Sequence, residues 1–428
     1  MTSTTLPTAV TLAGPSAALW RYGLLGAPLA FVALPLYVTL PRHYAEHFGL
    51  SLATIGTLLL VVRGLDALVD PWLGRLADRW LDHSSRRALL AGAASAVLLA
   101  SGFVALFHPP WRETGLLLTW CALSLVLTYL GYSLLSLLHQ AWGSRMGGDA
   151  GRRAAVTGWR EAAALTGVLV ASVLLSLAGM TTTAAVLAVA LAAGLFALAS
   201  GPSAAQRGLA RTTPDMDTWM PWRQPAFRAL LLCYLVNGIA SAIPATLVLF
   251  FIRDRLQAPQ WEAAFLGAYF AAAALSMPLW LILIRRIGLT RTWLAGMLLA
   301  VATFVGAASL GAGDVLPFLA VCLGSGLALG ADLAVPGALL TGIVHRNGHG
   351  ARHEGLYLGW WNAAGKLNLA LAAGVALPAL QLLGYQADTA DNEPFSALVL
   401  IYAVLPCALK LMAAMFLWRA RSALAEDA

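Results

Sequence analysis

Long apolar stretches alternate with short polar breaks along nearly the whole chain. A stretch of about 20 apolar residues is long enough to cross the hydrocarbon core of a bilayer as an α-helix. Each stretch is therefore predicted to be a membrane-spanning helix, which makes the protein an all-α membrane protein. The twelve predicted spans lie near residues 17–41, 51–78, 88–107, 115–142, 156–179, 181–200, 226–252, 261–284, 291–311, 314–344, 354–383 and 394–419.

The segment 201–225 interrupts this pattern, because it is rich in proline and charge and holds no long apolar run. We predict a linker here, between an N-terminal six-helix bundle at 1–200 and a C-terminal six-helix bundle at 226–428. The two halves are weak copies of one another, since Pro71 in the second span aligns with Pro278 in the eighth. Two pseudo-symmetric bundles are typical of secondary transporters, which bind substrate between the repeats.

Composition excludes several classes of protein. Hydrophobic residues make up 60% of the chain and charged residues only 11%, which excludes an ordinary soluble enzyme and a disordered chain. The net charge of +7 is spread over the breaks between apolar stretches rather than gathered on one face, so no nucleic-acid partner is expected. The expected surroundings are a lipid bilayer.

Basic residues predict the orientation, because short loops rich in arginine stay in the cytoplasm. The breaks after the even-numbered spans hold most of the arginines, and the first fifteen residues lack the order of a cleavable signal. We expect a multi-pass protein of the cytoplasmic (inner) membrane with both termini in the cytoplasm. Those breaks contain Arg79, Arg86, Arg87, Arg145, Arg152, Arg153, Arg207, Arg211, Arg223, Arg285, Arg286, Arg291, Arg346 and Arg352.

Three charged residues inside the second span form one polar stripe. Arg63, Asp66 and Asp70 fall within roughly 60° of one another on a helix of about 100° per residue. A charge at bilayer depth costs at least ~2.5 kcal/mol, so these residues need a partner or a function. Because Arg63 can compensate only one acid, one monovalent cation, Na⁺, Li⁺ or H⁺, would neutralise the group. The alternative is a salt bridge that only orients the helix.

Further polar residues inside the predicted spans indicate a wet cavity lined by both halves. Adjacent charges such as Arg160 and Glu161, or Asp332 with Lys366, could instead be structural ion pairs. An aromatic ring beside polar donors can stack on a sugar, which singles out Tyr132 and Trp361, although most tryptophans should be interfacial. The candidate substrate-binding residues are Arg160, Tyr132, Asn237, Asp332, Trp361 and Asn362.

A second polar group follows the stripe at the predicted cytoplasmic end of the same helix. Gly74 allows close approach of another helix, Asp78 can cap or pair with it, and the arginines face anionic headgroups. We expect this group to be a cytoplasmic gate. Its members are Gly74, Asp78, Arg79, Arg86 and Arg87.

No motif of a hydrolase or an ATP-driven pump is present, so we expect no catalytic residues and no cofactor beyond the coupling ion. His345, His349 and His353 are spaced by four, but glycines interrupt that segment. A solvated loop is therefore expected there rather than a metal site.

The segment from Arg63 to Gly74, RGLDALVDPWLG, resembles the glycoside-pentoside-hexuronide:cation symporters, the major facilitator superfamily group that includes melibiose permease. Gly49-Leu50-Ser51, Arg352-His353-Glu354-Gly355, Lys366 and Gly384-Tyr385 add to the resemblance. The resemblance implies the major facilitator fold and a cation site made of Asp66, Asp70 and the hydroxyl of Thr128. It also implies that Arg160 positions sugar and that Lys366 lies close to both sites.

The sugar half of the family pattern differs here. Pro28 and Gly131 stand near the positions where galactoside transporters of the family carry aspartates, so galactoside transport is not expected. The expected function is cation-coupled symport of a small organic solute, such as a sugar, glycoside or uronate, by a monomer with alternating access. Other possibilities are a lysolipid, amphiphile or drug transporter of the same fold, a membrane receptor or scaffold, and an intramembrane enzyme.

Overall fold

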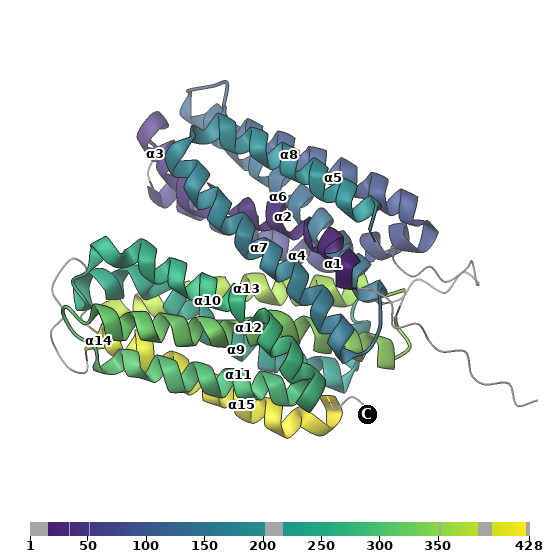
Figure 1. Cartoon of the computed structure of the whole chain (residues 1–428). Coiled ribbons are helices and arrows are strands. Elements are labelled where there is room, and N and C mark those ends of the chain that lie inside the picture. The colour runs from purple at the N-terminus through teal and green to yellow at the C-terminus, as the bar shows by residue number, and fades with distance from the viewer. Residues whose placement is uncertain are drawn as a thin grey trace, which may run out of the picture.

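The computed structural model describes residues 16–33, 35–50, 52–201, 217–350, 352–383 and 396–424, and their regular secondary structure is helical. The helices form two bundles that lie side by side (Figure 1), one coloured purple to teal and the other green to yellow. Predicted linker residues 202–216 lie outside the described residues, as do Gly384 and Tyr385.

The first predicted span, 17–41, is divided rather than continuous. It is covered by the short helices α1 (Ser16–Gly23) and α2 (Gly26–Phe31), by the π-helix η1 (Pro35–Thr39) and by the start of α3 (Leu40–Phe48). Glycines flank the first break because α7 (Ala150–Leu177) packs directly on them. A Cβ on Gly23 would lie 2.7 Å from the carbonyl oxygen of Trp159, and one on Gly26 would lie 2.5 Å from that of Arg160.

The remaining helices follow the predicted spans closely. The N-terminal bundle continues with α4 (Leu52–His83), α5 (Ser85–Phe107), α6 (Thr114–Arg145), α7 and α8 (Gly179–Ala199). The C-terminal bundle contains α9 (Pro225–Phe250) with η3 (Phe251–Arg255), η4 (Pro259–Trp261) with α10 (Glu262–Ile287), α11 (Leu289–Phe304) with η5 (Val305–Ser309), α12 (Val315–Arg346), α13 (Glu354–Leu382), and α14 (Ala397–Val399) with η6 (Leu400–Val404) and α15 (Leu405–Leu424).

Within the described ranges, eight helical segments are long and apolar enough to cross a membrane. The prediction of twelve spans is therefore supported in part. Many large apolar side chains are exposed on the bundles, which suits contact with lipid rather than water. They include Leu60, Leu68, Leu90, Val97, Val189, Phe196, Leu275, Leu279, Leu316 and Leu382.

The two bundles contact each other through α4 with α13 and through α7 with α10 and α12. We call the end of the molecule that holds Gly201, the 3-10 helix η2 (Met220–Arg223) and the C-terminal end of α15 the linker end (Figure 1). There the chain before α9 bridges both halves. The carbonyl oxygen of Thr218 accepts from Trp360 on α13 at 3.0 Å, and the Thr218 hydroxyl accepts from Arg75 on α4 at 2.8 Å.

Candidate functional site

A lysine and two carboxylates meet between the bundles. The ammonium of Lys366, on α13, lies 2.6 Å from Asp66 Oδ2 and 2.7 Å from Asp70 Oδ2, both on α4. Ser133, on α6, accepts from Lys366 at 3.0 Å and donates to Asp66 Oδ1 at 2.7 Å. Asp70 is fully buried. We call Asp66, Asp70, Ser133 and Lys366 the lysine–carboxylate cluster.

The cluster holds its positive charge between two acids that come from the other half of the molecule. Removing one partner of a buried ion pair leaves an unpaired charge, so Lys366 and the acids hold the two halves together. The ammonium lies where a monovalent cation was predicted to neutralise the polar stripe. Sequence reasoning assigned charge compensation to Arg63 as well, and that side chain lies beside Tyr129 and Tyr132 on α6.

The hydroxyl in the cluster belongs to Ser133 rather than to Thr128. Thr128 is fully buried on the face of α6 that packs on α5, where a Cβ on Gly102 would lie 2.7 Å from its Oγ1. Its hydroxyl donates to the carbonyl oxygen of Ser124 at 2.6 Å. Ser133 lies on the face of α6 that meets α4, where its hydroxyl donates to Asp66. A polar side chain inside a predicted span was the only sequence signal for it, and the sequence did not show that this face of α6 meets α4.

Several predicted substrate residues gather nearer the linker end. Arg160 pairs with Glu161, its Nε donating to Glu161 Oε1 at 3.0 Å. The Trp361 indole stacks on Tyr234, with ring centroids 3.8 Å apart, so one face of the indole is covered. Between the halves lies a cavity of about 30 Å³ whose lining includes Tyr22, Gln140, Arg153, Arg160, Thr341 and Trp361. Tyr132 and Asn362 are half-buried on α6 and α13.

The other two predicted substrate residues belong to the interior of the C-terminal bundle. Asp332, on α12, accepts from Asn237 at 3.1 Å and from the indole of Trp293 at 2.8 Å. Its ion-pair partner is Lys410 on α15, 2.8 Å away. The alternative pairing of Asp332 with Lys366 is therefore wrong, since Lys366 pairs across the halves. Lys366 and Lys410 are the two lysines of the chain.

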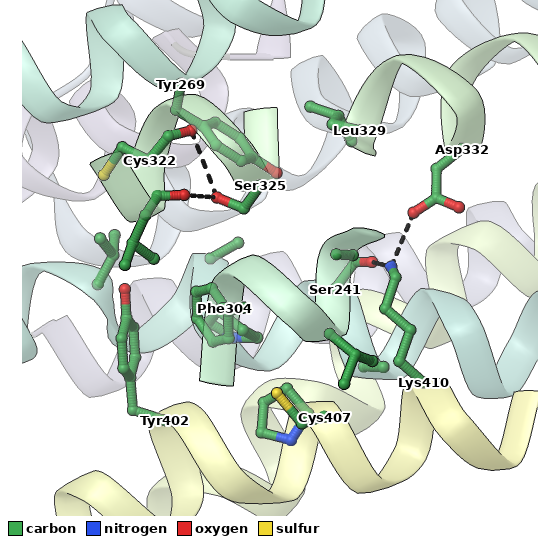
Figure 2. Close-up of a pocket in the computed structure, with 18 of the residues that line it drawn as sticks. Ser241, Tyr269, Phe304, Cys322, Ser325, Leu329, Asp332, Tyr402, Cys407 and Lys410 are labelled. Atoms are coloured by element: carbon green, nitrogen blue, oxygen red, sulfur yellow. Dashed lines mark hydrogen bonds and ion pairs between the residues drawn. The ribbon is translucent and has the colours of Figure 1, made fainter. Parts of the chain in front are cut away.

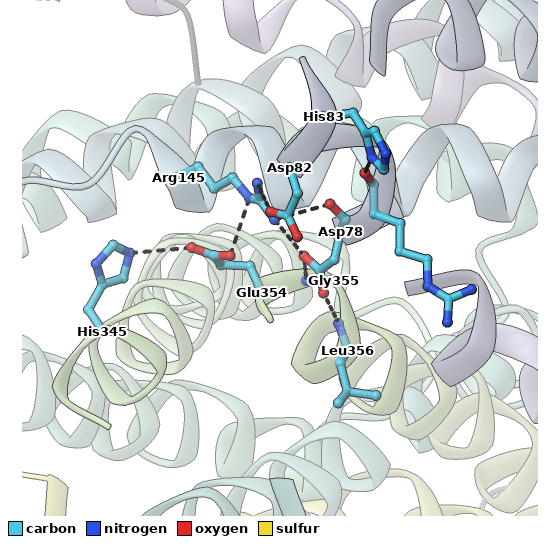
Figure 3. Close-up of polar contacts among 9 residues, drawn as sticks. Asp78, Asp82, His83, Arg145, His345, Glu354, Gly355 and Leu356 are labelled. Atoms are coloured by element: carbon cyan, nitrogen blue, oxygen red, sulfur yellow. Dashed lines mark hydrogen bonds and ion pairs between the residues drawn. The ribbon is translucent and has the colours of Figure 1, made fainter. Parts of the chain in front are cut away.

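At the linker end, Arg145 joins three acids from both halves (Figure 3). This fully buried guanidinium lies 3.0 Å from Asp78, 2.8 Å from Asp82 and 3.3 Å from Glu354 at the start of α13. Asp78 also accepts from the backbone N–H groups of Gly355 at 2.8 Å and Leu356 at 3.0 Å. A carboxylate is favourable at a helix N-terminus, where backbone N–H groups lack partners. We call Asp78, Asp82, Arg145 and Glu354 the latch.

Two of the predicted gate residues lie in this contact between α4 and α13. A Cβ on Gly74 would overlap the carbonyl group of Gly355, so the backbones touch there. Arg79, Arg86 and Arg87 are exposed. The buried arginine of the latch is Arg145, which sequence reasoning counted only as a loop charge because it could not pair residues on separate helices.

The three spaced histidines are not all solvated. His345 lies with its Nε2 3.1 Å from the carbonyl oxygen of Ser144, across the halves. His349 contacts the hydroxyl of Tyr357 at 2.9 Å. Burial, and after it the nearby positive charges of His349 and Arg352, lower the pKa of His353 to about 4. Within the described part of the chain, no three His, Cys, Asp or Glu side chains are grouped to hold a metal ion.

The profile of the family described as MFS/sugar transport protein matches residues 20–421. The chain belongs to this family. The match confirms the resemblance to the cation symporters of the major facilitator superfamily. The protein is therefore a transporter and not an enzyme, as expected.

Curated relatives support the assignment over shorter segments. The putative glycoside/cation symporter YagG of Escherichia coli (strain K12) is 31% identical over 153 residues, 35% of this chain and 33% of that protein. The uncharacterized symporter YnaJ of Bacillus subtilis (strain 168) is 39% identical over 93 residues, 21% of this chain and 19% of that protein. The inner membrane symporter YicJ of E. coli (strain K12) is 28% identical over 134 residues, 31% of this chain and 28% of that protein. The chain therefore aligns with a third or less of each relative's length.

Solved structures share the fold over nearly the whole chain. A bacterial homologue of the iron transporter ferroportin, in an outward-facing state, aligns with a TM-score of 0.70 and 19% identity over 95% of this chain and 99% of that one. The transporter FucP in the outward conformation aligns with a TM-score of 0.69 and 12% identity over 96% and 99%. These likenesses show the fold. The protein is a multi-pass membrane transporter with the major facilitator fold.

Proposed function

We propose that the protein is an inner-membrane symporter that takes up a small organic solute together with one monovalent cation. The observation that supports this most directly is the lysine–carboxylate cluster, in which α13 of one half supplies the counter-charge for Asp66 and Asp70 of the other. A cation that binds these acids replaces Lys366, so the ion and the contact between the halves are coupled. One positive charge falling through ~100 mV contributes about 2.3 kcal/mol to uptake.

The closed linker end fits one step of alternating access. Arginine-rich breaks assign this end, with both termini, to the cytoplasm. With the latch closed, the cation and the solute enter from the other side of the membrane. Na⁺, Li⁺ and H⁺ are the candidate ions, bound by Asp66, Asp70 and Ser133. We expect the carrier to act as a monomer, because Asp66, Asp70, Ser133 and Lys366 all come from one chain.

The solute is a sugar, a glycoside or a uronate that binds where the polar cavity between the halves now has a volume of only about 30 Å³, so the halves must separate to admit it. Arg160 and Trp361 line that cavity, and a guanidinium suits an acidic or hydroxyl-rich ligand. On α6, Gly131 stands near the position where galactoside transporters of the family carry an aspartate. A Cβ at Gly131 would lie 2.5 Å from the backbone nitrogen of Leu99. No side chain fits at that position, so a galactoside would lack this hydrogen-bond acceptor.

Uptake into proteoliposomes tests the proposal. A panel of labelled sugars, glycosides, uronates and lysolipids is offered with an imposed Na⁺, Li⁺ or pH gradient. Asp70→Asn should abolish cation-dependent uptake, because the amide cannot bind a cation as a carboxylate does. The matched control Glu262→Gln changes a carboxylate outside the cluster and should leave uptake intact. Unchanged ion dependence in Asp70→Asn refutes the cation site, and uptake of lysolipids alone refutes the solute class.

A further inference from the structure

The C-terminal bundle contains a partly open cavity that the coupled transport described above does not use. Its volume is about 190 Å³, and its lining comes from α9, α10, α11, α12, η6 and α15 of one half (Figure 2). A dry cavity of about 150 Å³ is large enough for benzene. The size therefore suits one aromatic ring with a short substituent.

The lining is apolar and aromatic over most of its surface. The ring of Tyr402 extends toward the space between η6 and α12, and Phe304 and Tyr269 lie beside it (Figure 2). Phe265 and Phe318 complete an aromatic wall. Edge-to-face and offset contacts with such rings favour an aromatic ligand over an aliphatic chain of equal volume.

One end of the cavity is charged, because Lys410 and Asp332 lie there (Figure 2). Lys410 is only 8% exposed, and its ammonium donates to Asp332 at 2.8 Å and to the Ser241 hydroxyl at 3.0 Å. Ser241 in turn donates to the carbonyl oxygen of Asn237 at 3.1 Å. An ammonium has three N–H donors, and the described residues account for two of them, which leaves the third for an acceptor in the cavity.

The acid of the pair is closer to saturation. Asp332 accepts from Lys410, from Asn237 and from the indole of Trp293. The end of the cavity therefore offers a charged donor rather than an acceptor. A carboxylate matches this donor best, because a hydrogen bond between two ions is stronger than one to a neutral oxygen.

We propose that this cavity is a second binding site, within the C-terminal bundle, for a small aryl carboxylate whose ring lies among the aromatic side chains and whose carboxylate accepts from Lys410. The site is separate from the lysine–carboxylate cluster and goes beyond the proposed symport function. An aromatic acid bound there would affect the carrier without occupying the proposed cation site.

Equilibrium binding to the purified full chain tests this site with three probes of the same shape. They are 3-phenylpropanoate, 3-phenylpropanol and 3-phenylpropylamine, which carry a negative charge, no charge and a positive charge. The carboxylate should bind saturably and at least about tenfold more tightly than the alcohol, and the amine most weakly. Equal affinity for the alcohol, tighter binding of the amine, or no saturable binding at millimolar concentrations overturns the proposal.

Variants locate the bound probe. Ser325→Leu fills the cavity without touching the ion pair, since the Ser325 hydroxyl donates to carbonyl oxygens of its own helix, and it should weaken binding at least about tenfold. Ser101→Leu makes the same change on an exposed face of α5 and should leave affinity unchanged. Lys410→Met should remove the preference for the carboxylate. Normal affinity in Ser325→Leu, or loss of binding in Asp70→Asn, overturns the assignment to this cavity.

Discussion

Gly74 on α4 and Gly355 on α13 bring the backbones of the two halves into direct contact. A Cβ on either residue would overlap the other's carbonyl oxygen, and the Gly355 N–H donates to Asp78 only 2.8 Å away. The close approach therefore brings the start of α13 within reach of the latch.

Gly74→Ala should open this contact. An added methyl at a backbone contact costs roughly 1–3 kcal/mol, which shifts the equilibrium between closed and open forms by about fivefold or more. Hydrogen exchange measured by mass spectrometry should become faster in the peptide that holds Gly355 and Leu356. Gly64→Ala is the matched control on the same helix, because no heavy atom lies within 4 Å of a Cβ there. Equal exchange in the two variants would show that the contact does not hold the halves together.

Ser133→Ala should lower the affinity for the coupling cation about threefold to tenfold, the effect of one lost hydrogen-bonding oxygen. Thr128→Val should leave that affinity unchanged, because the Thr128 hydroxyl donates within its own helix. Cation titration of uptake in proteoliposomes measures both. A loss of affinity confined to Thr128→Val would favour the hydroxyl implied by the family resemblance.

Arg145→Lys should weaken the latch by about 3 kcal/mol, since one ammonium cannot replace a guanidinium that faces three carboxylates in a buried position. Thermal unfolding of the purified protein measures the loss. Arg223→Lys, in an exposed pair with Asp217, should change stability by less than ~1 kcal/mol. Similar stability of both variants would contradict a role for the buried network.

His353 should make the closed linker end sensitive to acid. Its pKa is lowered to about 4 from the ordinary value of 6.5, so between these pH values the unfolded chain takes up a proton that the folded form does not. The folded form therefore keeps its full stability above pH 6.5 and loses it as the pH falls towards 4. His353→Gln should show a smaller drop in melting temperature between pH 7 and pH 5 than the unchanged protein. An equal drop would assign the acid sensitivity to other groups.

Most of the helices could be predicted from the sequence, because the length of an apolar stretch is enough to identify a membrane-spanning helix. It also placed Asp66 and Asp70 on one face, which needs only the helical repeat. It could not predict that Lys366 approaches them from the other half, since nothing local pairs residues 300 positions apart. The rule that a charge inside a span needs a partner could have singled out Lys410. Its pairing with Asp332 could not be predicted, because that contact depends on tertiary packing.

The helix α13 carries Glu354 at its first residue and Lys366 twelve positions later, a separation of about 18 Å along one uninterrupted rod. In the proposed mechanism, an incoming ion that displaces Lys366 moves this helix, and the movement reaches Glu354 and the latch. The stiffness of this single helix is thus the proposed link between occupancy of the cation site and closure of the latch.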